Sequence, residues 1–147
     1  MSADSQRVAQ FIAVHSAEDR LRTVCEWTLK CYTKGKTVAV HLADPEDADR
    51  LDGKMWTFKD MAFLPHVRVS QAQEPILEPV IIYESGQDVK KADVLFEVGG
   101  EDVLPGFERF PYIFDLAVVY DEACRQNSRT RYSAYQDAGY EMRYIDR

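Results

Sequence analysis

The chain has 147 residues, 46% of them hydrophobic and 29% charged, which is enough for one domain with a substantial core. Its 25 acidic residues exceed its 18 basic ones, so a net charge of −7 disfavours direct binding to DNA or RNA outside a concentrated basic patch. The three cysteines have no disulfide-framework spacing, and no apolar run approaches the roughly 20 residues of a membrane span. We therefore expect buried free thiols, a cytoplasmic location and no membrane contact.

Short runs of β-branched and apolar residues predict the strands. In chain order these runs cover residues 8–14, 37–42, 80–83, 93–98 and 116–120, and residues 141–145 predict a last edge strand. Residues 56–66 and 101–114 are rich in aromatic residues and interrupted by proline, so we expect irregular structure there, with at most a short helix in the second. Residues 71–79 read as a loop.

Three helices are expected between these strands. Ser16 caps the first helix, and Gly35 ends it. Pro45 opens the second, whose buried row is Ala48, Leu51 and Met55. The third helix has about 17 residues; Asp121 caps it and Gly139 ends it.

Strands that alternate with helices predict an α/β fold in a single Rossmann-like domain, 1–147, with a mostly parallel sheet and helices on both faces. Ligands of such sheets bind at the carboxyl ends of the strands. The first strand-to-helix turn, His15-Ser16-Ala17, lacks the glycines of a phosphate-binding loop, and no such loop occurs elsewhere. We therefore expect no nucleotide cofactor.

Other chemical motifs are also missing from the sequence. His15, His41 and His66 are far apart and no cysteine pair has metal-ligand spacing, so we expect no metal. His41 reads as a satisfied histidine of a buried strand, and no serine–histidine–acid pattern is visible. We expect a protein that is not an enzyme. The alternative is a small α/β enzyme or nucleotide-binding protein with an atypical site near the strand ends, using His66, Arg129 or Tyr132.

The third helix carries an unusual stripe for so acidic a protein: Arg125, Arg129, Tyr132 and Gln136. An arginine fork beside a tyrosine suits a peptide with a carboxylate end and an aromatic body. A solvated basic face with one exposed tyrosine explains the spacing equally well. A direct single-strand binder, with bases stacked on Trp56 and Tyr132, is a third hypothesis. Arg131 faces the core side, where we expect it to reach an edge and pair with an acid.

Two segments of the chain carry a family resemblance. The first is Leu-Asp-Gly-Lys-Met-Trp56 with Phe63-Leu64-Pro65-His66. The second is Val118-Val119-Tyr120 with Arg129-Thr-Arg131-Tyr132-Ser-Ala-Tyr135-Gln-Asp-Ala-Gly139-Tyr140. Together they resemble the chi subunit of bacterial DNA polymerase III. The element order and length fit over nearly the whole chain, although residues 71–112 match poorly.

The resemblance implies a non-catalytic accessory subunit of the clamp-loader assembly in DNA replication. It implies a heterodimer with the psi subunit, a monomer when alone, and indirect contact with DNA through the acidic C-terminal tail of single-stranded DNA-binding protein. Carried over by position, the tail pocket comprises Trp56, Phe63, Val118, Arg129, Tyr132 and Gln136. Gln136 stands where a basic residue is expected, which predicts weaker or less salt-sensitive tail binding and puts its own contact in doubt.

The psi-binding surface has only a candidate in the sequence. Leu104, Phe107, Phe110, Tyr112 and Phe114 are dense apolar residues in an irregular segment. Leu104, Phe107, Phe110 and Tyr112 would form a docking patch if exposed. The alternative, that these side chains pack over the sheet edge, is the stronger of the two.

Overall fold

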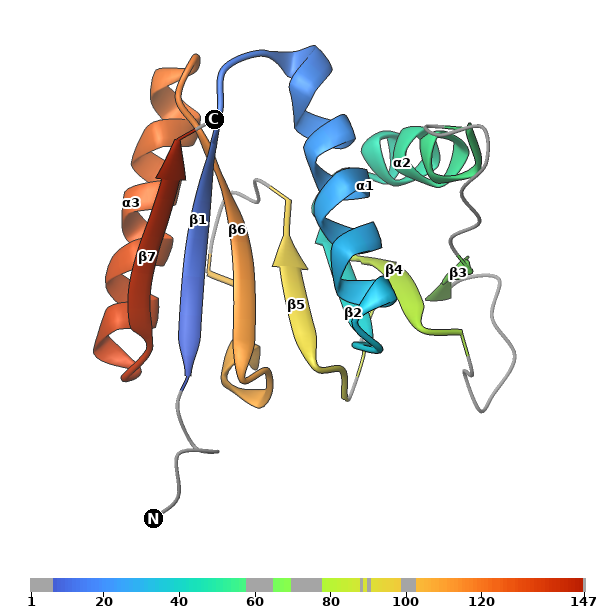
Figure 1. Cartoon of the computed structure of the whole chain (residues 1–147). Helices are drawn as coiled ribbons and strands as arrows, with labels where there is room; N and C mark the ends of the chain where they lie inside the picture. The colour runs from blue at the N-terminus through green and yellow to red at the C-terminus, as the bar shows by residue number, and fades with distance from the viewer. Residues whose placement is uncertain are drawn as a thin grey trace.

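The protein is built around one parallel β-sheet (Figure 1). The computed structural model describes residues 7–57, 65–69, 78–87, 89, 91–98 and 103–146. Its seven strands lie in the order β3-β4-β2-β5-β6-β1-β7, and every neighbouring pair is parallel. The strands are β1 (Val8–Val14), β2 (Val38–Leu42), β3 (His66–Arg68), β4 (Val80–Glu84), β5 (Val94–Glu97), β6 (Tyr112–Val118) and β7 (Glu141–Asp146).

Three α-helices connect and cover the strands: α1 (Ala17–Thr33), α2 (Pro45–Thr57) and α3 (Glu122–Asp137). Ser16 Oγ accepts a hydrogen bond from the Asp19 backbone N–H, and Asp121 Oδ1 accepts one from Cys124, so both predicted caps are confirmed. Gly139 follows α3 with φ 92°, a conformation that favours a residue without a Cβ atom.

The helices lie on both faces of the sheet, as Figure 1 shows. Helices α1 and α2 pack on one face, where Val40, Leu51 and Phe96 belong to the core. Helix α3 packs on the other face, around Phe11 and Tyr135. The predicted α/β, Rossmann-like fold with a parallel sheet is confirmed. The two sheet edges, β3 beside α2 and β7 beside α3, lie at opposite ends of the strand order.

Two sequence-based expectations were wrong in this region. Strand β6 covers Tyr112–Val118 rather than residues 116–120, so its first residues lie inside the segment expected to be irregular. Pro111 precedes the strand and does not interrupt it. Tyr112 and Phe114 lie on one face of the sheet, and Ile113 between them lies on the other. The short β3, only three residues long, was not predicted. Among the described residues, no helix is long and apolar enough to cross a membrane.

Candidate functional site

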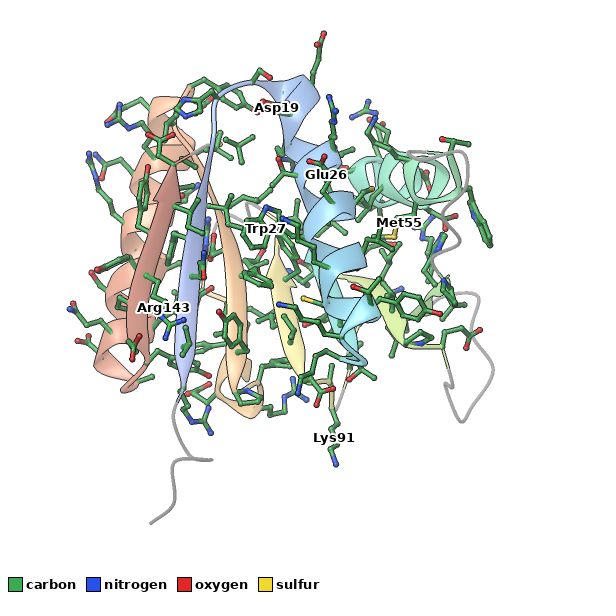
Figure 2. The ribbon with its side chains drawn as sticks, viewed as in Figure 1. Asp19, Glu26, Trp27, Met55, Lys91 and Arg143 are labelled. Carbon is green, nitrogen blue, oxygen red and sulfur yellow. The ribbon has the colours of Figure 1, made fainter. Side chains whose placement is uncertain are left out.

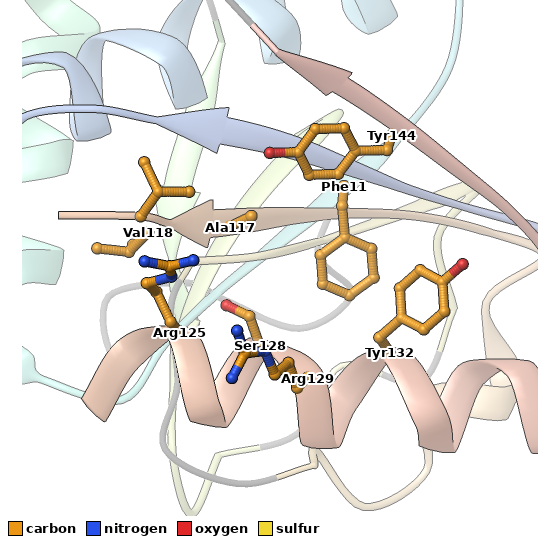
Figure 3. Close-up of a pocket in the computed structure, with 9 residues that line it drawn as sticks. Phe11, Ala117, Val118, Arg125, Ser128, Arg129, Tyr132 and Tyr144 are labelled. Atoms are coloured by element: carbon orange, nitrogen blue, oxygen red, sulfur yellow. The ribbon is translucent and has the colours of Figure 1, made fainter. Parts of the chain in front are cut away.

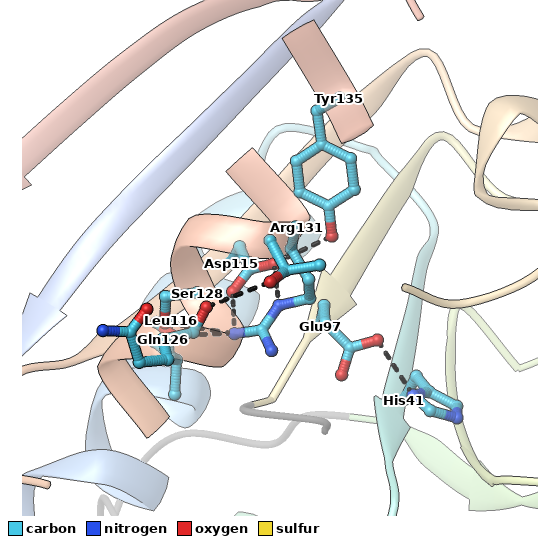
Figure 4. Close-up of polar contacts among 9 residues, drawn as sticks. His41, Glu97, Asp115, Leu116, Gln126, Ser128, Arg131 and Tyr135 are labelled. Carbon is cyan, nitrogen blue, oxygen red and sulfur yellow. Dashed lines mark hydrogen bonds and ion pairs between the residues drawn. The ribbon is translucent and has the colours of Figure 1, made fainter. Parts of the chain in front are cut away.

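Arg131 anchors α3 to the sheet through a buried ion pair with Asp115 of β6 (Figure 4). Arg131 Nε and Nη2 donate to the two Asp115 carboxylate oxygens at 2.8 and 2.9 Å, and the Tyr135 hydroxyl donates to the same carboxylate at 2.8 Å. Ser128 Oγ lies 3.3 Å from Arg131 Nη2. The guanidinium is 1% exposed and Asp115 is fully buried.

The expected acid partner of Arg131 therefore exists, but the expectation that the side chain reaches an edge was wrong. Burial raises the pKa of Asp115 to about 6, against the lowering effect of Arg131, so the carboxylate is ionised at neutral pH. Burial lowers the pKa of Arg131, but the Asp115 carboxylate outweighs this and raises it above the usual value, so the cation persists. This pair sets the rotation of α3 and thereby decides which residues face outward.

The outward side of α3 forms a hollow with the strands next to it, which we call the α3 hollow (Figure 3). Its volume is about 200 Å³, less than the roughly 300–1,000 Å³ of small-molecule pockets. A space of this size suits one side chain and its flanking groups. The lining residues are Phe11, Ala117, Val118, Val119, Arg125, Ser128, Arg129, Tyr132 and Tyr144.

The hollow exists because small residues face each other across α3 and β6. Ala117 and Ser128 leave space that larger side chains would fill. Phe11 forms the floor, with its ring centroid 5.5 Å from that of Tyr132. Tyr144, the neighbour of Phe11 in the β1–β7 register, adds a second rim tyrosine that is 56% exposed. One end of the hollow is therefore an aromatic cage with polar tips.

Cations occupy the other part of the rim. Arg125 and Arg129 are both exposed. Within the described part of the chain, neither forms an ion pair with a carboxylate. Figure 3 shows Arg125 and Val118 at one end and Tyr132 and Tyr144 at the other, with Phe11 between them. The arrangement suits an anion joined to an aromatic or aliphatic group.

The structure brings together Val118, Arg129 and Tyr132 of the expected tail pocket. Gln136 is exposed one turn beyond Tyr132 and does not line the hollow, in line with the doubt that its identity raised. Phe63 lies outside the described residues. Sequence reasoning missed six of the nine lining residues, among them the aromatic and charged ones Phe11, Arg125 and Tyr144. Arg125 belonged to the basic stripe, but only the strand order reveals that Phe11 and Tyr144 are its neighbours.

Trp56 is the clear correction to that pocket. It lies near the end of α2, which packs against β2, β3 and β4, whereas α3 packs against β6 and β7. The two helices cover opposite faces and opposite edges of the sheet, so Trp56 cannot contact a ligand in the α3 hollow. Its indole is 55% exposed and lies 4.4 Å from the His66 ring, centroid to centroid. His66 Nε2 is in turn 2.9 Å from Asp52 Oδ1.

The residues of the expected psi-docking patch do not form an exposed apolar surface. Phe107 is 7% exposed and Phe110 is fully buried. The Tyr140 hydroxyl donates to the Phe110 carbonyl at 2.6 Å, which fixes this segment over the sheet. Leu104 packs against the same core, while Tyr112 packs on the opposite face, against Phe114. The alternative, packing over the sheet, is the arrangement found.

A second buried polar group joins β2, β4 and β5 where these strands end. His41 Nδ1 lies 3.0 Å from Glu97 Oε1, and Ser85 Oγ lies 3.4 Å from His41 Nε2. The order of hydroxyl, imidazole and carboxylate is that of a nucleophilic triad, which the sequence did not reveal. The Ser85 contact is longer than the roughly 2.6–3.2 Å of a nucleophile and its base. We assign the group a structural role, the satisfied buried histidine that was expected.

Among the described residues, no three histidine, cysteine or acidic side chains are placed to hold one ion. Burial raises the pKa of the Cys25 thiol to about 12, which keeps it protonated and a poor ligand.

The fold agrees with the comparisons with known proteins. The family model described as "DNA polymerase III chi subunit, HolC" matches residues 7–143. The chain therefore belongs to the chi subunit family, accessory subunits of DNA polymerase III. DNA polymerase III subunit chi of Pseudomonas aeruginosa is 32% identical over 90% of this chain and 91% of its own length. The Escherichia coli subunit is 25% identical over 81% of this chain and 80% of its own.

Solved structures share the fold at low identity. T4 UvsW superposes with a TM-score of 0.66 at 11% identity and 97% coverage of this chain. Yeast Dbp5 bound to RNA and ADP BeF3 gives 0.62 at 13% identity and 99% coverage. The chain spans 42% of each of these structures, so the likeness concerns the α/β fold alone.

Proposed function

We propose that this accessory subunit links the clamp loader, through the psi subunit, to the acidic C-terminal tail of single-stranded DNA-binding protein during DNA replication. The observation that carries the proposal is the position of two arginines, Arg125 and Arg129, beside the aromatic cage of the α3 hollow, with no acidic partner for either among the described residues. On a chain of net charge −7, exposed cations without acidic partners mark a place where an external anion is favoured.

The chemistry of such a tail fits the hollow in two parts. A terminal carboxylate or a tail acid accepts hydrogen bonds from a guanidinium, and each charge-assisted bond contributes roughly 1.5–3 kcal/mol. The aromatic end of the tail packs on Phe11 between Tyr132 and Tyr144, where the ring leaves water. The acidity elsewhere on the protein disfavours contact with DNA itself, so the contact with DNA is indirect.

For the psi subunit we propose docking at the opposite edge of the sheet, around Trp56. Among the described residues of α2 and the strands beside it, its indole is the most exposed large aromatic, and tryptophan is a frequent anchor of protein interfaces. The contact with His66, itself held near Asp52, fixes the ring in place. Two partners on opposite edges bind without excluding each other.

Titration with a synthetic peptide tests the tail site. The peptide ends in several acidic residues and a C-terminal phenylalanine with a free carboxylate, and binding is followed by fluorescence anisotropy. Arg129→Ala, Arg125→Ala or amidation of the peptide should each weaken binding about tenfold or more, equal to 1.4 kcal/mol. Gln136→Ala is the matched control on the same helix and should change affinity less than twofold. Unchanged affinity in all three tests would contradict the site.

A further inference from the structure

A second groove lies on the opposite face of the sheet, between the last turns of α1 and the amino ends of β5 and β6. We call it the α1 groove. Its volume is about 420 Å³, twice that of the α3 hollow. Its floor and wall are aromatic. The ring centroid of Trp27 of α1 lies 5.3 Å from that of Phe114, and the Tyr112 ring packs edge-on against Phe114 with the centroids 5.2 Å apart. Figure 2 shows Trp27 reaching from α1 toward the strands.

Three lysines surround this aromatic floor. Lys30 belongs to the last turn of α1, Lys34 is the C-cap residue of that helix, and Lys36 follows two residues later. Lys30 Nζ sits 4.5 Å from the centre of the Trp27 ring. Within the described residues, none of the three forms an ion pair, whereas Arg20, Arg68 and Arg131 are all paired.

Part of this positive charge offsets the carbonyl end of α1, because cations are favoured at helix C-termini. Lys30 and Lys34 suffice for that role, and Lys36 lies beyond the helix. Asp93 is the one acid that lines the groove. Its Oδ2 accepts hydrogen bonds from the Thr37 backbone N–H at 2.9 Å and from the Thr37 hydroxyl at 3.2 Å. The groove therefore keeps a net positive charge.

We propose that the α1 groove binds a short acidic peptide segment of a partner protein, with an apolar side chain of that segment on Trp27 and Tyr112. The three lysines supply the charge complementarity, and Gln10 and Tyr112 offer polar atoms to the peptide backbone. The site shares no residue with the α3 hollow, and this inference does not rest on the tail-binding function.

The open shape of the groove favours a peptide over a small molecule. Helix α1 forms one wall, but no helix stands in front of β1 and β7 on this side (Figure 1). Small-molecule sites bury most of the ligand surface, roughly 70–90%, which a groove with one wall does not achieve. A nucleic acid strand is disfavoured as well, because beyond the groove its phosphates would meet a protein of net charge −7.

The test uses a labelled peptide with a phenylalanine between two pairs of glutamates, acetylated and amidated so that it lacks the free carboxylate of the tail probe. Binding to the full chain is measured by fluorescence anisotropy. Lys30→Glu/Lys34→Glu should weaken it at least tenfold. Arg22→Glu/Arg50→Glu is the matched control, with the same change in net charge at exposed positions that line neither the groove nor the α3 hollow, and should change it less than threefold. Replacing the peptide phenylalanine with alanine should also weaken binding about tenfold, with no change to the protein.

Four outcomes would overturn the proposal. They are no binding to the unaltered protein, equal loss in both double variants, no effect of the phenylalanine replacement, and tighter binding of an oligo-dT strand that the lysine variant abolishes. The last would assign the groove to nucleic acid. Because the α3 hollow is tested separately, with the tail probe and the Arg125→Ala and Arg129→Ala variants, failure here leaves its assignment unaffected.

Discussion

The two edges of the sheet use aromatic residues in different ways. At the β7 edge, Phe11, Tyr132 and Tyr144 surround a hollow beside Arg125 and Arg129, which pair with no acid in the described part of the chain. At the β3 edge, Trp56 stands 55% exposed above His66. The first edge offers a cavity with charge, suited to the end of a chain, and the second offers a projecting ring, suited to burial under a folded partner. The two segments that carry the family resemblance, one with Trp56 and one with Arg129 and Tyr132, therefore belong to two separate surfaces.

The largest expected effect tests what holds the hollow at its edge. Arg131→Met removes the cation that pairs with Asp115 and leaves a buried carboxylate without it, which costs about 3–5 kcal/mol of unfolding free energy. Arg129→Met, two residues earlier on the exposed face, should change stability by less than about 0.5 kcal/mol. Urea denaturation followed by circular dichroism measures both. Similar values for the two variants would mean that the buried pair does not anchor α3.

The comparison of edges predicts a separation of partners. Trp56→Ala should weaken capture of the psi subunit about tenfold or more while leaving the affinity for the tail peptide within twofold, because Trp56 does not line the α3 hollow. Arg129→Ala should show the reverse pattern. Pull-down with purified psi and peptide anisotropy, run on the same preparations, measure the two affinities. A joint loss in either variant would show that the two edges are coupled.

A pH series sharpens the account of the buried pair. Burial raises the folded-state pKa of Asp115 to about 6, above its unfolded value, so protonation favours the folded state as the pH falls. In Arg131→Met this pKa rises further, because Arg131 lowers it in the unaltered protein.

As the pH falls from the raised pKa of the variant to about 6, the folded variant takes up a proton that the unaltered protein does not. The difference in unfolding free energy between the unaltered protein and Arg131→Met should therefore narrow as the pH is lowered through this window. It narrows by about 1.4 kcal/mol for each unit that separates the Asp115 pKa values of the two proteins. Urea midpoints at several pH values measure it. A constant gap would place the lost stability in packing rather than in charge.

Local signals in the sequence predicted most helices and strands. Contacts between residues far apart in the sequence could not be predicted from it. Ser16 and Asp121 were recognisable as caps because a helix start depends on three or four neighbouring residues. The partner of Arg131 was not, because Asp115 stands within an apolar strand and only the packing of α3 on β6 joins them. Trp56 was misplaced for the same reason, since the sequence spacing of a motif does not reveal which sheet edge a helix covers.

The position of β1 in the sheet also bears on how the protein is made. Val8 pairs with Tyr112 on one side and with Glu141 on the other, so the first strand has no neighbour until the last third of the chain has been synthesised. Until then β1, with its apolar residues such as Phe11, lacks the two strands that later pair with it. Such distant pairing slows folding and exposes nascent chains to aggregation. The α3 hollow needs β1, β6, β7 and α3 together, so it forms only after the last strand is available to pair with the first.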